Sequence, residues 1–267
     1  MAGVEAAGEA VTVDTLALRN CTTLEGFRAC VALQQEVWGF SDAELVPLRI
    51  FSLAPKIGGH VVGAWDGETL VGFAMAIPGN RNGHPYLHSH MVAVKEGHRN
   101  TGLGRKIKLF QREDALTQGY ELMEWTFDPL EIKNAYFNLE RLGAIARRYN
   151  VNQYGITNSP LQGLLPTDRL VAEWWMTSRR VQTVLSSGHH PPINAEEKVE
   201  VPAKIYHWKS DPAMRSNAVQ VQSRNRELFQ SAFSRGLSCL GYERDAEGNG
   251  CFQLGCWEEN LSYAQNS

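Results

Sequence analysis

The segment between residues 87 and 119 constrains the fold more than any other part of the chain. Leu87–Val94 has the pattern of a strand, and the residues from about Leu103 to Thr117 form a predicted helix that ends at Gly119. The loop Arg99-Asn-Thr-Gly-Leu-Gly104 joins the two. A strand that passes through a glycine-rich loop into a helix is one unit of a sheet covered by helices, so we predict an α/β fold.

Other segments extend this sheet. His60–Trp65 and Leu70–Ala76 are strand-like, and Asp66-Gly67 between them favours a hairpin turn. Further strands are predicted at Val11–Leu18, Glu121–Phe127, Arg147–Tyr154 and Leu170–Thr177. Helices are predicted from Thr22 or Thr23 to Trp38, at Val46–Lys56 and at Ile132–Leu142, with a polar loop at Pro78–Pro85. Because hairpins and strand–helix units are mixed, both parallel and antiparallel neighbours are expected.

The best internal boundary is the stretch Ser186–Pro192, which is rich in turn-forming residues. We therefore predict a disordered lead-in at residues 1–10, a catalytic domain at 11–185 and a small α+β extension at 193–267. The extension is predicted to contain a strand at Lys198–Trp208, a helix at Ala213–Ser234 and a hairpin of Leu237–Tyr242 with Cys251–Cys256. It is expected to act as a lid, to complete the acceptor pocket or to mediate a homodimer.

Composition excludes several classes of protein. The net charge of −3 provides no basic excess for coating nucleic acid. No apolar run reaches the roughly 18 residues of a membrane span, and the N-terminus lacks the basic start of a secretory signal. The five cysteines are odd in number and scattered, so we expect reduced thiols, no metal site and a cytoplasmic location.

The Arg99–Gly104 loop has the properties of an anion site. Gly102 and Gly104 allow close approach of a ligand to the backbone, and the first helical N–H groups favour negative charge. Arg105, Lys106 and Lys108 would add cations. A plain chain-reversing turn stays an alternative. A P-loop would need Lys-Ser/Thr after Gly104, and a dinucleotide fold would need a third glycine.

The residues from Met91 to Gly143 resemble the GNAT superfamily of acyltransferases. Its signature is Arg or Gln, two residues, Gly, one residue, then Gly or Ala at a strand-to-helix junction, as in Arg99–Gly104. The later segment Asn134-Ala-Tyr-Phe-Asn-Leu-Glu-Arg-Leu-Gly143 agrees, and the resemblance covers about residues 11–155. The stretch from Thr157 to Arg169 looks like a bacterial branch of predicted acyltransferases. The resemblance implies a mixed, mostly antiparallel sheet with flanking helices.

The resemblance also implies acetyl-CoA or another acyl-CoA as co-substrate. The pyrophosphate would lie on the loop amides, and the pantetheine arm would follow the strand before the loop. The residues implied in cofactor binding are Met91, Val92, Val94, Arg99, Asn100, Thr101, Gly102, Leu103, Gly104, Arg105 and Asn134. The implied reaction is direct attack of an amine on the thioester, moving an acetyl or succinyl group to a small molecule such as an amino acid.

The expected catalytic groups depart from the family pattern. Relatives often place a Glu eleven residues before the motif Arg, where this chain has His88, with His90 on the same strand face. Either imidazole could serve as base, or could simply be a polar member of the strand. Relatives often carry a Tyr acid where this chain has Leu139, so Asn134 and Tyr136 are the remaining candidates near the thiol.

For the acceptor, Glu124 is the alternative base or a substrate contact, and Arg169 could hold a substrate carboxylate or form a surface ion pair. The missing Tyr and Glu keep a second hypothesis open, a non-catalytic sensor or scaffold that binds acyl-CoA.

Overall fold

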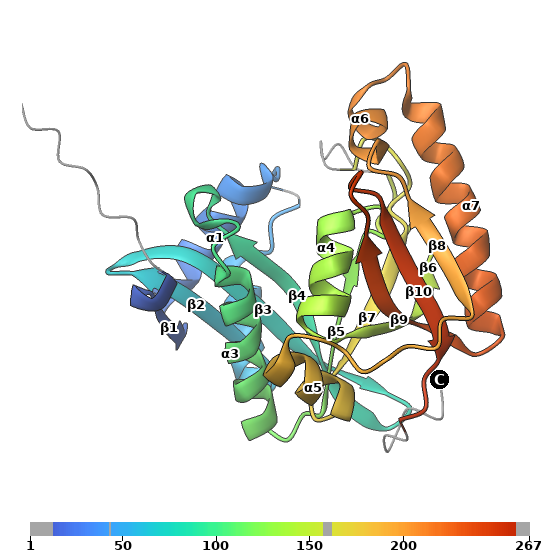
Figure 1. Cartoon of the computed structure of the whole chain (residues 1–267). Helices are drawn as coiled ribbons and strands as arrows, with labels where there is room; N and C mark the ends of the chain where they lie inside the picture. Colours follow the sequence, from blue (N-terminus) through green and yellow to red (C-terminus); the bar gives the residue numbers. More distant parts are fainter. Residues whose placement is uncertain (1–12, 43, 157–161, 260–267) are drawn as a thin grey trace, which may run out of the picture. The chain divides into compact units, whose positions relative to one another are not determined.

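The computed structural model describes residues 13–42, 44–156 and 162–259 (Figure 1). It divides into two compact units. The first contains the chain up to Pro78 together with Ser89–Asp114, and the second contains Gly79–His88 and the chain from Ala115 onward. The predicted lead-in lies outside the described residues. The predicted boundary at 186–192 falls inside the second unit, and the predicted domain limits stay a prediction.

The first unit is built on antiparallel strands. The strands β1 (Ala17–Asn20), β2 (His60–Asp66) and β3 (Thr69–Arg81) pair in that order. The predicted strand at 11–18 is wrong over Val13–Thr15, which forms a 3-10 turn, because Leu16 N–H donates to the Val13 carbonyl and closes the turn.

The helices of the first unit begin and end as their capping residues dictate. Helix α1 (Leu24–Trp38) begins at Thr23, whose Oγ1 accepts from Gly26 N–H at 3.2 Å, and ends at Gly39 with a φ of 64°. The predicted helix 46–56 is shorter than expected, as α2 (Leu48–Leu53) followed by the 3-10 turn η2 (Ala54–Ile57). Helix α3 (Leu103–Thr117) has its predicted bounds.

The first unit has hydrophobic contacts on both faces of its strands. Adjacent Val61 and Val62 point to opposite faces, as strand geometry requires. Val61 packs in a cluster with Phe27 and Leu33 of α1, whereas Val62 packs in a cluster with Ile107 of α3. Helices α1 and α3 therefore cover opposite faces, and α3 is fixed directly behind the loop that precedes it.

The predicted polar loop at Pro78–Pro85 is wrong. Strand β3 continues to Arg81, and β4 (His84–Val94) begins after only two residues. Those residues are Asn82 and Gly83, with φ values of 53° and 85°. Asn-Gly with two positive φ angles is the preferred two-residue hairpin turn, so the overlooked dipeptide explains the continuation of both strands.

The second unit confirms the mixed, mostly antiparallel sheet. Its strands lie in the order β5 (Leu122–Phe127), β7 (Arg169–Trp175), β6 (Ile145–Asn150), β9 (Leu237–Arg244), β10 (Gly250–Cys256) and β8 (Glu197–Val201). The pairing of β4 with β5 is parallel, at Leu87↔Met123 and His88↔Glu124, and the other pairings in this unit are antiparallel. The predicted hairpin of β9 and β10 is confirmed, and the C-terminal strands continue the same sheet rather than forming a separate one.

The helices of the second unit include two that were not predicted. Helix α5 (Arg179–Ser187) follows Ser178, whose side chain accepts from Val181 N–H at 3.2 Å. The predicted helix at 132–142 is confirmed as α4 (Ile132–Tyr136) plus a π-helical turn, η4 (Phe137–Arg141). The predicted strand at 198–208 is wrong after Val201, because Pro202 cannot donate to a ladder and α6 (Ile205–Ser210) follows. Helix α7 (Arg215–Ser234) packs on β6 and β8 (Figure 1).

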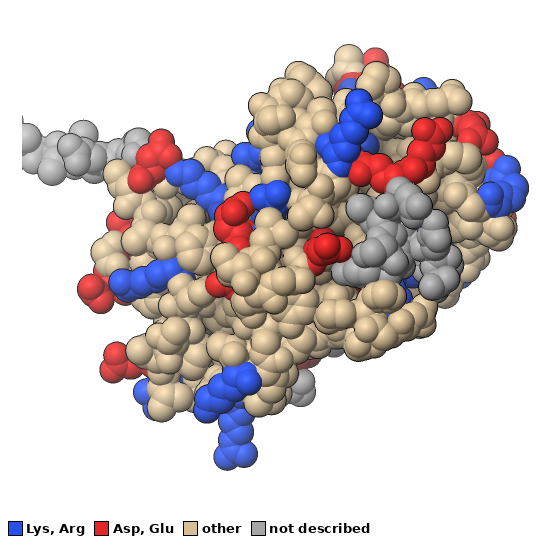
Figure 2. Space-filling view, turned by 90° about the horizontal axis from the view of Figure 1, so that it is seen from below, with Lys and Arg blue, Asp and Glu red and all other residues tan. Residues whose placement is uncertain are grey.

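The charges of the surface, the character of the helices and the placement of potential metal ligands bear on function. Figure 2 shows one face on which Lys and Arg are interspersed with Asp and Glu, without a large patch of one sign. Over the described ranges, the helices lack the combination of length and apolar character that crossing a bilayer demands. Within the same ranges, no three potential metal-ligating side chains gather.

Candidate functional site

The loop before α3 has the backbone form that its glycines predict. Asn100 and Gly102 have φ values of 62° and 94°, and a Cβ added at Gly102 or Gly104 would meet nothing within 4 Å. The first backbone bond of the helix runs from Lys106 N–H to the Gly102 carbonyl at 3.1 Å. The amides of Leu103 and Gly104 precede it and have no acceptor within the helix. Residues 99–104 therefore present backbone donors beside open space, as an anion site requires.

Side chains of the loop hold its shape. Arg99 Nε donates to the Val94 carbonyl at 3.1 Å, and Thr101 Oγ1 donates to the His98 carbonyl at 2.7 Å. The first bond connects the loop to the end of β4, and the second connects it to the 3-10 turn Glu96–His98 just before the loop. The Lys106 amine is engaged in an ion pair with Asp14. Arg99 and Thr101 thus position the loop backbone, which is the part predicted to hold the pyrophosphate.

Lys108 does not add the cation that the sequence suggests. Its side chain is buried, and its Nζ donates to Ser89 Oγ at 3.0 Å. Burial lowers the pKa of this amine well below its ordinary value. The prediction that Lys108 contributes charge to the loop is therefore wrong, because the residue faces the interior between α3 and β4.

Lys108 begins a buried polar chain. Ser89 Oγ donates to Gln111 Oε1 at 3.1 Å, and Gln111 Nε2 lies 3.0 Å from His60 Nε2. The other ring nitrogen of His60 lies 2.7 Å from Asp114 Oδ2. These bonds satisfy the polar groups between β4, α3 and β2, and they fix the strand that leads into the loop.

The β4 residues predicted to border the cofactor contribute packing through their side chains. Met91 packs on the cluster of α1, whereas Val92 and Val94 pack on the cluster that contains Leu103 of α3. Their backbone groups stay the predicted contacts for pantetheine. His90 is exposed, and desolvation by the surrounding chain lowers the pKa of its ring. These residues and the loop all belong to the first unit.

The other predicted base, His88, belongs to the second unit. It is half-buried and is the ladder partner of Glu124 on β5. Glu124 is only 3% exposed at its side chain and is ion-paired with Arg81 at 2.7 Å and with Arg148 at 2.5 Å. The structure thus brings His88 and Glu124 side by side. It also engages the Glu124 carboxylate with two arginines, which disfavours its role as the alternative base.

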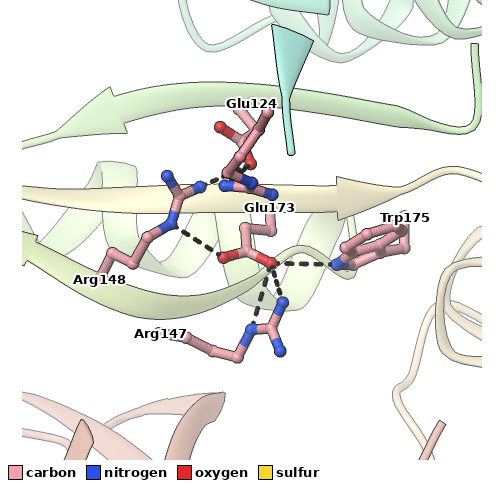
Figure 3. Close-up of polar contacts among 6 residues, drawn as sticks. Glu124, Arg147, Arg148, Glu173 and Trp175 are labelled. Carbon is pink, nitrogen blue, oxygen red and sulfur yellow. Dashed lines mark hydrogen bonds and ion pairs between the residues drawn. The ribbon is translucent and has the colours of Figure 1, made fainter. Parts of the chain in front are cut away.

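A second glutamate completes this group (Figure 3). Glu173 on β7 is the ladder partner of Glu124, and its carboxylate binds Arg147 at 2.6 Å and Arg148 at 3.2 Å. Trp175 Nε1 donates to it at 3.2 Å. Burial opposes ionisation, but the neighbouring arginines hold the pKa of Glu173 below its ordinary range. A β-bulge in β6 at Arg147 allows both consecutive arginines to reach the carboxylates.

This Arg–Glu group was missed by the sequence prediction except for Glu124. The signal was present, because Glu124 and Glu173 each interrupt a strand whose other members are almost all buried and apolar. A charge at such a position requires a partner. The adjacent Arg147 and Arg148 were the available partners, but only the bulge brings both to one site.

The residues considered as the acid for the leaving thiol lie on α4 and η4. Asn134 is exposed, and Leu139 is fully buried, so the position of the missing Tyr carries an apolar packing residue. Tyr136 is 37% exposed and lines a cavity of about 1040 Å³ together with residues of the C-terminal strands, including Lys198, Arg244 and Cys251. Asn134 and Tyr136 lie on the second unit, and their catalytic roles stay predictions.

Arg169 is half-buried on the first residue of β7. It donates to the Asp168 carbonyl at 2.9 Å and to Gln162 Oε1 at 3.3 Å, and its guanidinium lies 5.6 Å from the centre of the Tyr154 ring. The adjacent carboxylate is not its ion-pair partner, since Asp168 is buried and pairs with Arg226 at 2.8 Å. The Asp168–Arg169 surface ion pair is therefore excluded, and the contact of Arg169 with an acceptor stays a prediction.

The Arg99–Gly104 loop lies in a segment that matches a known protein family. Residues 27–143 match the model of the Acetyltransferase (GNAT) family, a range that begins inside α1, ends just after η4 and includes the Arg99–Gly104 loop. That segment, somewhat under half of the chain, matches a GNAT acetyltransferase domain. No curated protein sequence matches the chain.

Several solved structures are similar to part of this chain. yncA from Salmonella typhimurium, solved with its cofactor acetyl-CoA, is 14% identical with a TM-score of 0.50, covering 62% of this chain and 96% of its own. A GNAT family acetyltransferase from Elizabethkingia anophelis with acetyl-CoA bound is 14% identical with a TM-score of 0.45, covering 61% and 99%. The ribosomal-protein-S18-alanine N-acetyltransferase from Escherichia coli is 13% identical with a TM-score of 0.48, covering 61% and 97%. At 14% identity the likeness to yncA concerns the fold alone.

Proposed function

We propose that this GNAT protein transfers an acetyl or succinyl group from coenzyme A to the amine of a small molecule, with amino acids among the acceptors. The observation that supports the proposal is the loop at residues 99–104, where two positive φ angles and the amides of Leu103 and Gly104, which precede the first bond of the helix, would form a cradle for pyrophosphate. yncA, which has the same fold, was solved with acetyl-CoA. The residues of this chain fit the same co-substrate.

In the proposed reaction the acceptor amine attacks the thioester carbonyl directly. The nitrogen forms a bond to the acyl carbon, the carbon–sulfur bond breaks, and the amine loses one proton. Coenzyme A leaves as its thiolate. Leu139 cannot donate a proton, so solvent water protonates the thiolate unless another side chain acts as the acid. His88 or His90 takes the proton from the amine, and a backbone N–H of β4 near Val92 stabilises the oxyanion. Bound coenzyme A would supply only the activated acyl group.

The cysteines support a proposal for the compartment in which the protein acts. Cys21, Cys30, Cys239, Cys251 and Cys256 are all free thiols, which suits a reducing compartment, so we place the reaction in the cytoplasm. A homodimer formed through the C-terminal extension stays part of the proposal.

The proposal is tested by thiol release from acetyl-CoA and succinyl-CoA across a panel of amino acids, polyamines and amino sugars. We expect acceptor-dependent release for at least one class. Tight binding of acyl-CoA by titration calorimetry, without release for any acceptor, would instead support the sensor hypothesis.

Replacement of His88 by Ala tests the base. We expect kcat to fall about 10²–10⁴-fold, the usual contribution of a general base, while acetyl-CoA affinity is kept. The rate of the wild type should decline toward acid pH as the base becomes protonated, and the variant should lose that decline. His90→Ala is the matched comparison on the same strand. An unchanged pH–rate profile in H88A, with a changed one in H90A, would transfer the role to His90.

A further inference from the structure

The Arg–Glu group in the second unit has more positive than negative charge. Among the described residues, the side chains of Arg81, Arg147 and Arg148 contact the carboxylates of Glu124 and Glu173. Three guanidinium groups therefore face two carboxylates. The two glutamates are 3% and 0% exposed, so their charges are hidden from solvent.

The excess positive charge is partly exposed to solvent. The side chains of Arg148 and Arg81 are 34% and 21% exposed, well above the glutamates that hold them. Arg81 Nη1 lies 2.7 Å from Glu124 Oε1 without hydrogen-bond geometry, and it has no hydrogen-bond partner within the described ranges. This nitrogen is itself buried, so a ligand oxygen would reach the exposed part of the Arg81 side chain and the more exposed side chain of Arg148.

The position of the group relates it to the proposed base. His88, Glu124 and Glu173 are consecutive ladder partners on β4, β5 and β7, so they form a row across one face of the sheet. Neighbouring strands lie about 4.8 Å apart. A ligand oxygen on Arg81 or Arg148 would therefore lie within a few ångströms of His88.

We propose that Arg81 and Arg148 bind the carboxylate of the acceptor, which makes the substrate an amine that also bears a carboxylate, such as an α-amino acid. This inference rests on the proposed function and narrows it. A guanidinium fork matches the two oxygens of a carboxylate, and one carboxylate charge neutralises the single surplus charge of the group. A phosphate, with nearly two charges, would leave net negative charge beside two buried carboxylates. In an α-amino acid one carbon separates the two functional groups, which places the amine beside His88.

The test compares amino acids with their carboxamides as acceptors of the acetyl group, using thiol release. We expect the wild type to prefer the amino acid at least tenfold in kcat/KM. Arg148→Gln should reduce that preference at least tenfold while the KM for acetyl-CoA is unchanged, and Arg148→Lys should restore part of it. Arg235→Gln, which removes an exposed guanidinium paired with Glu197, is the matched control and should keep the preference.

The ratio of kcat/KM for the amino acid to kcat/KM for its carboxamide distinguishes a role in substrate binding from a structural role. A merely structural arginine would lower kcat/KM for the amino acid and its amide equally, and that result would overturn the inference, as would a wild-type ratio near one. Arg81→Gln provides a second variant should R148Q unfold. Absence of thiol release with every acceptor would contradict the proposed function instead. In that case, calorimetric titration of the full chain with the amino acid and its amide decides the inference, because only selective binding that R81Q or R148Q abolishes supports it.

Discussion

Replacing Gly102 by Val should weaken acetyl-CoA binding at least tenfold. Gly102 has a φ of 94°, a region where a β-branched residue is strained, and the space beside its Cα position is open for a ligand. A valine would shift the loop toward another backbone conformation and withdraw the amides of Leu103 and Gly104 from the pyrophosphate. The loss of about 1.4 kcal/mol that a tenfold change represents is well within this strain. Titration calorimetry with acetyl-CoA measures the effect.

Two variants at the ends of the same helix distinguish a change in loop conformation from a general loss of stability. Gly119 follows the other end of α3 with a φ of 83° and equally open space, so Gly119→Val should destabilise the protein without altering acetyl-CoA affinity. Gly104→Ala should keep the affinity, since the signature of this family allows Ala there, and should add about 0.5–1 kcal/mol of stability because Gly is a poor helix former. Equal affinities in G102V and the wild type would remove the loop from cofactor binding.

Replacing Glu173 by Gln should lower the free energy of unfolding by about 3–5 kcal/mol, the usual cost of removing one partner of a buried ion pair. The carboxylate is 0% exposed and binds Arg147, Arg148 and the Trp175 indole N–H. A neutral amide would leave two half-buried guanidinium groups without their shared counter-charge. Urea unfolding monitored by tryptophan fluorescence measures the difference.

The control is Glu197→Gln, which removes the carboxylate of a more exposed ion pair with Arg235 and should cost at most about 1 kcal/mol. A loss below 1 kcal/mol in E173Q would show that the buried group is not held by this carboxylate.

The contribution of Glu173 to the free energy of unfolding should also depend on pH. Its pKa in the folded chain is lowered from the ordinary value of 4.5, so the stabilisation is fully present above that value. It is lost as the pH falls through the lower pKa of the folded state, where the carboxylate finally takes up a proton. The difference in unfolding free energy between the wild type and E173Q should therefore be constant from pH 6 to 8 and should shrink toward acid pH. A difference that grows on acidification would contradict the assigned direction.

The local features of the first unit could be predicted because each is encoded in a few neighbouring residues. Thr23 and Gly39 bound α1, and Gly102 and Gly119 flank α3, since capping and positive φ are decided within a turn of the chain. The spacing of Arg99, Gly102 and Gly104 likewise predicted the anion loop. The Asn82-Gly83 turn was equally local and was simply overlooked.

The Arg–Glu group is different, because its members come from separate strands. Glu124 and Glu173 become neighbours only through the pairing of β5 with β7, and a bulge in β6 brings both Arg147 and Arg148 to them. Lys108 shows the same limit, since its position after the loop suggested a surface cation whereas packing of α3 on β4 buries it.

The sequence by itself determined the strand, loop and helix that we propose to hold coenzyme A, because short-range backbone preferences create them. Only the tertiary structure decided which charges are buried together, which reach solvent and which stand beside His88, because the energy of a charge depends on neighbours that are distant along the chain.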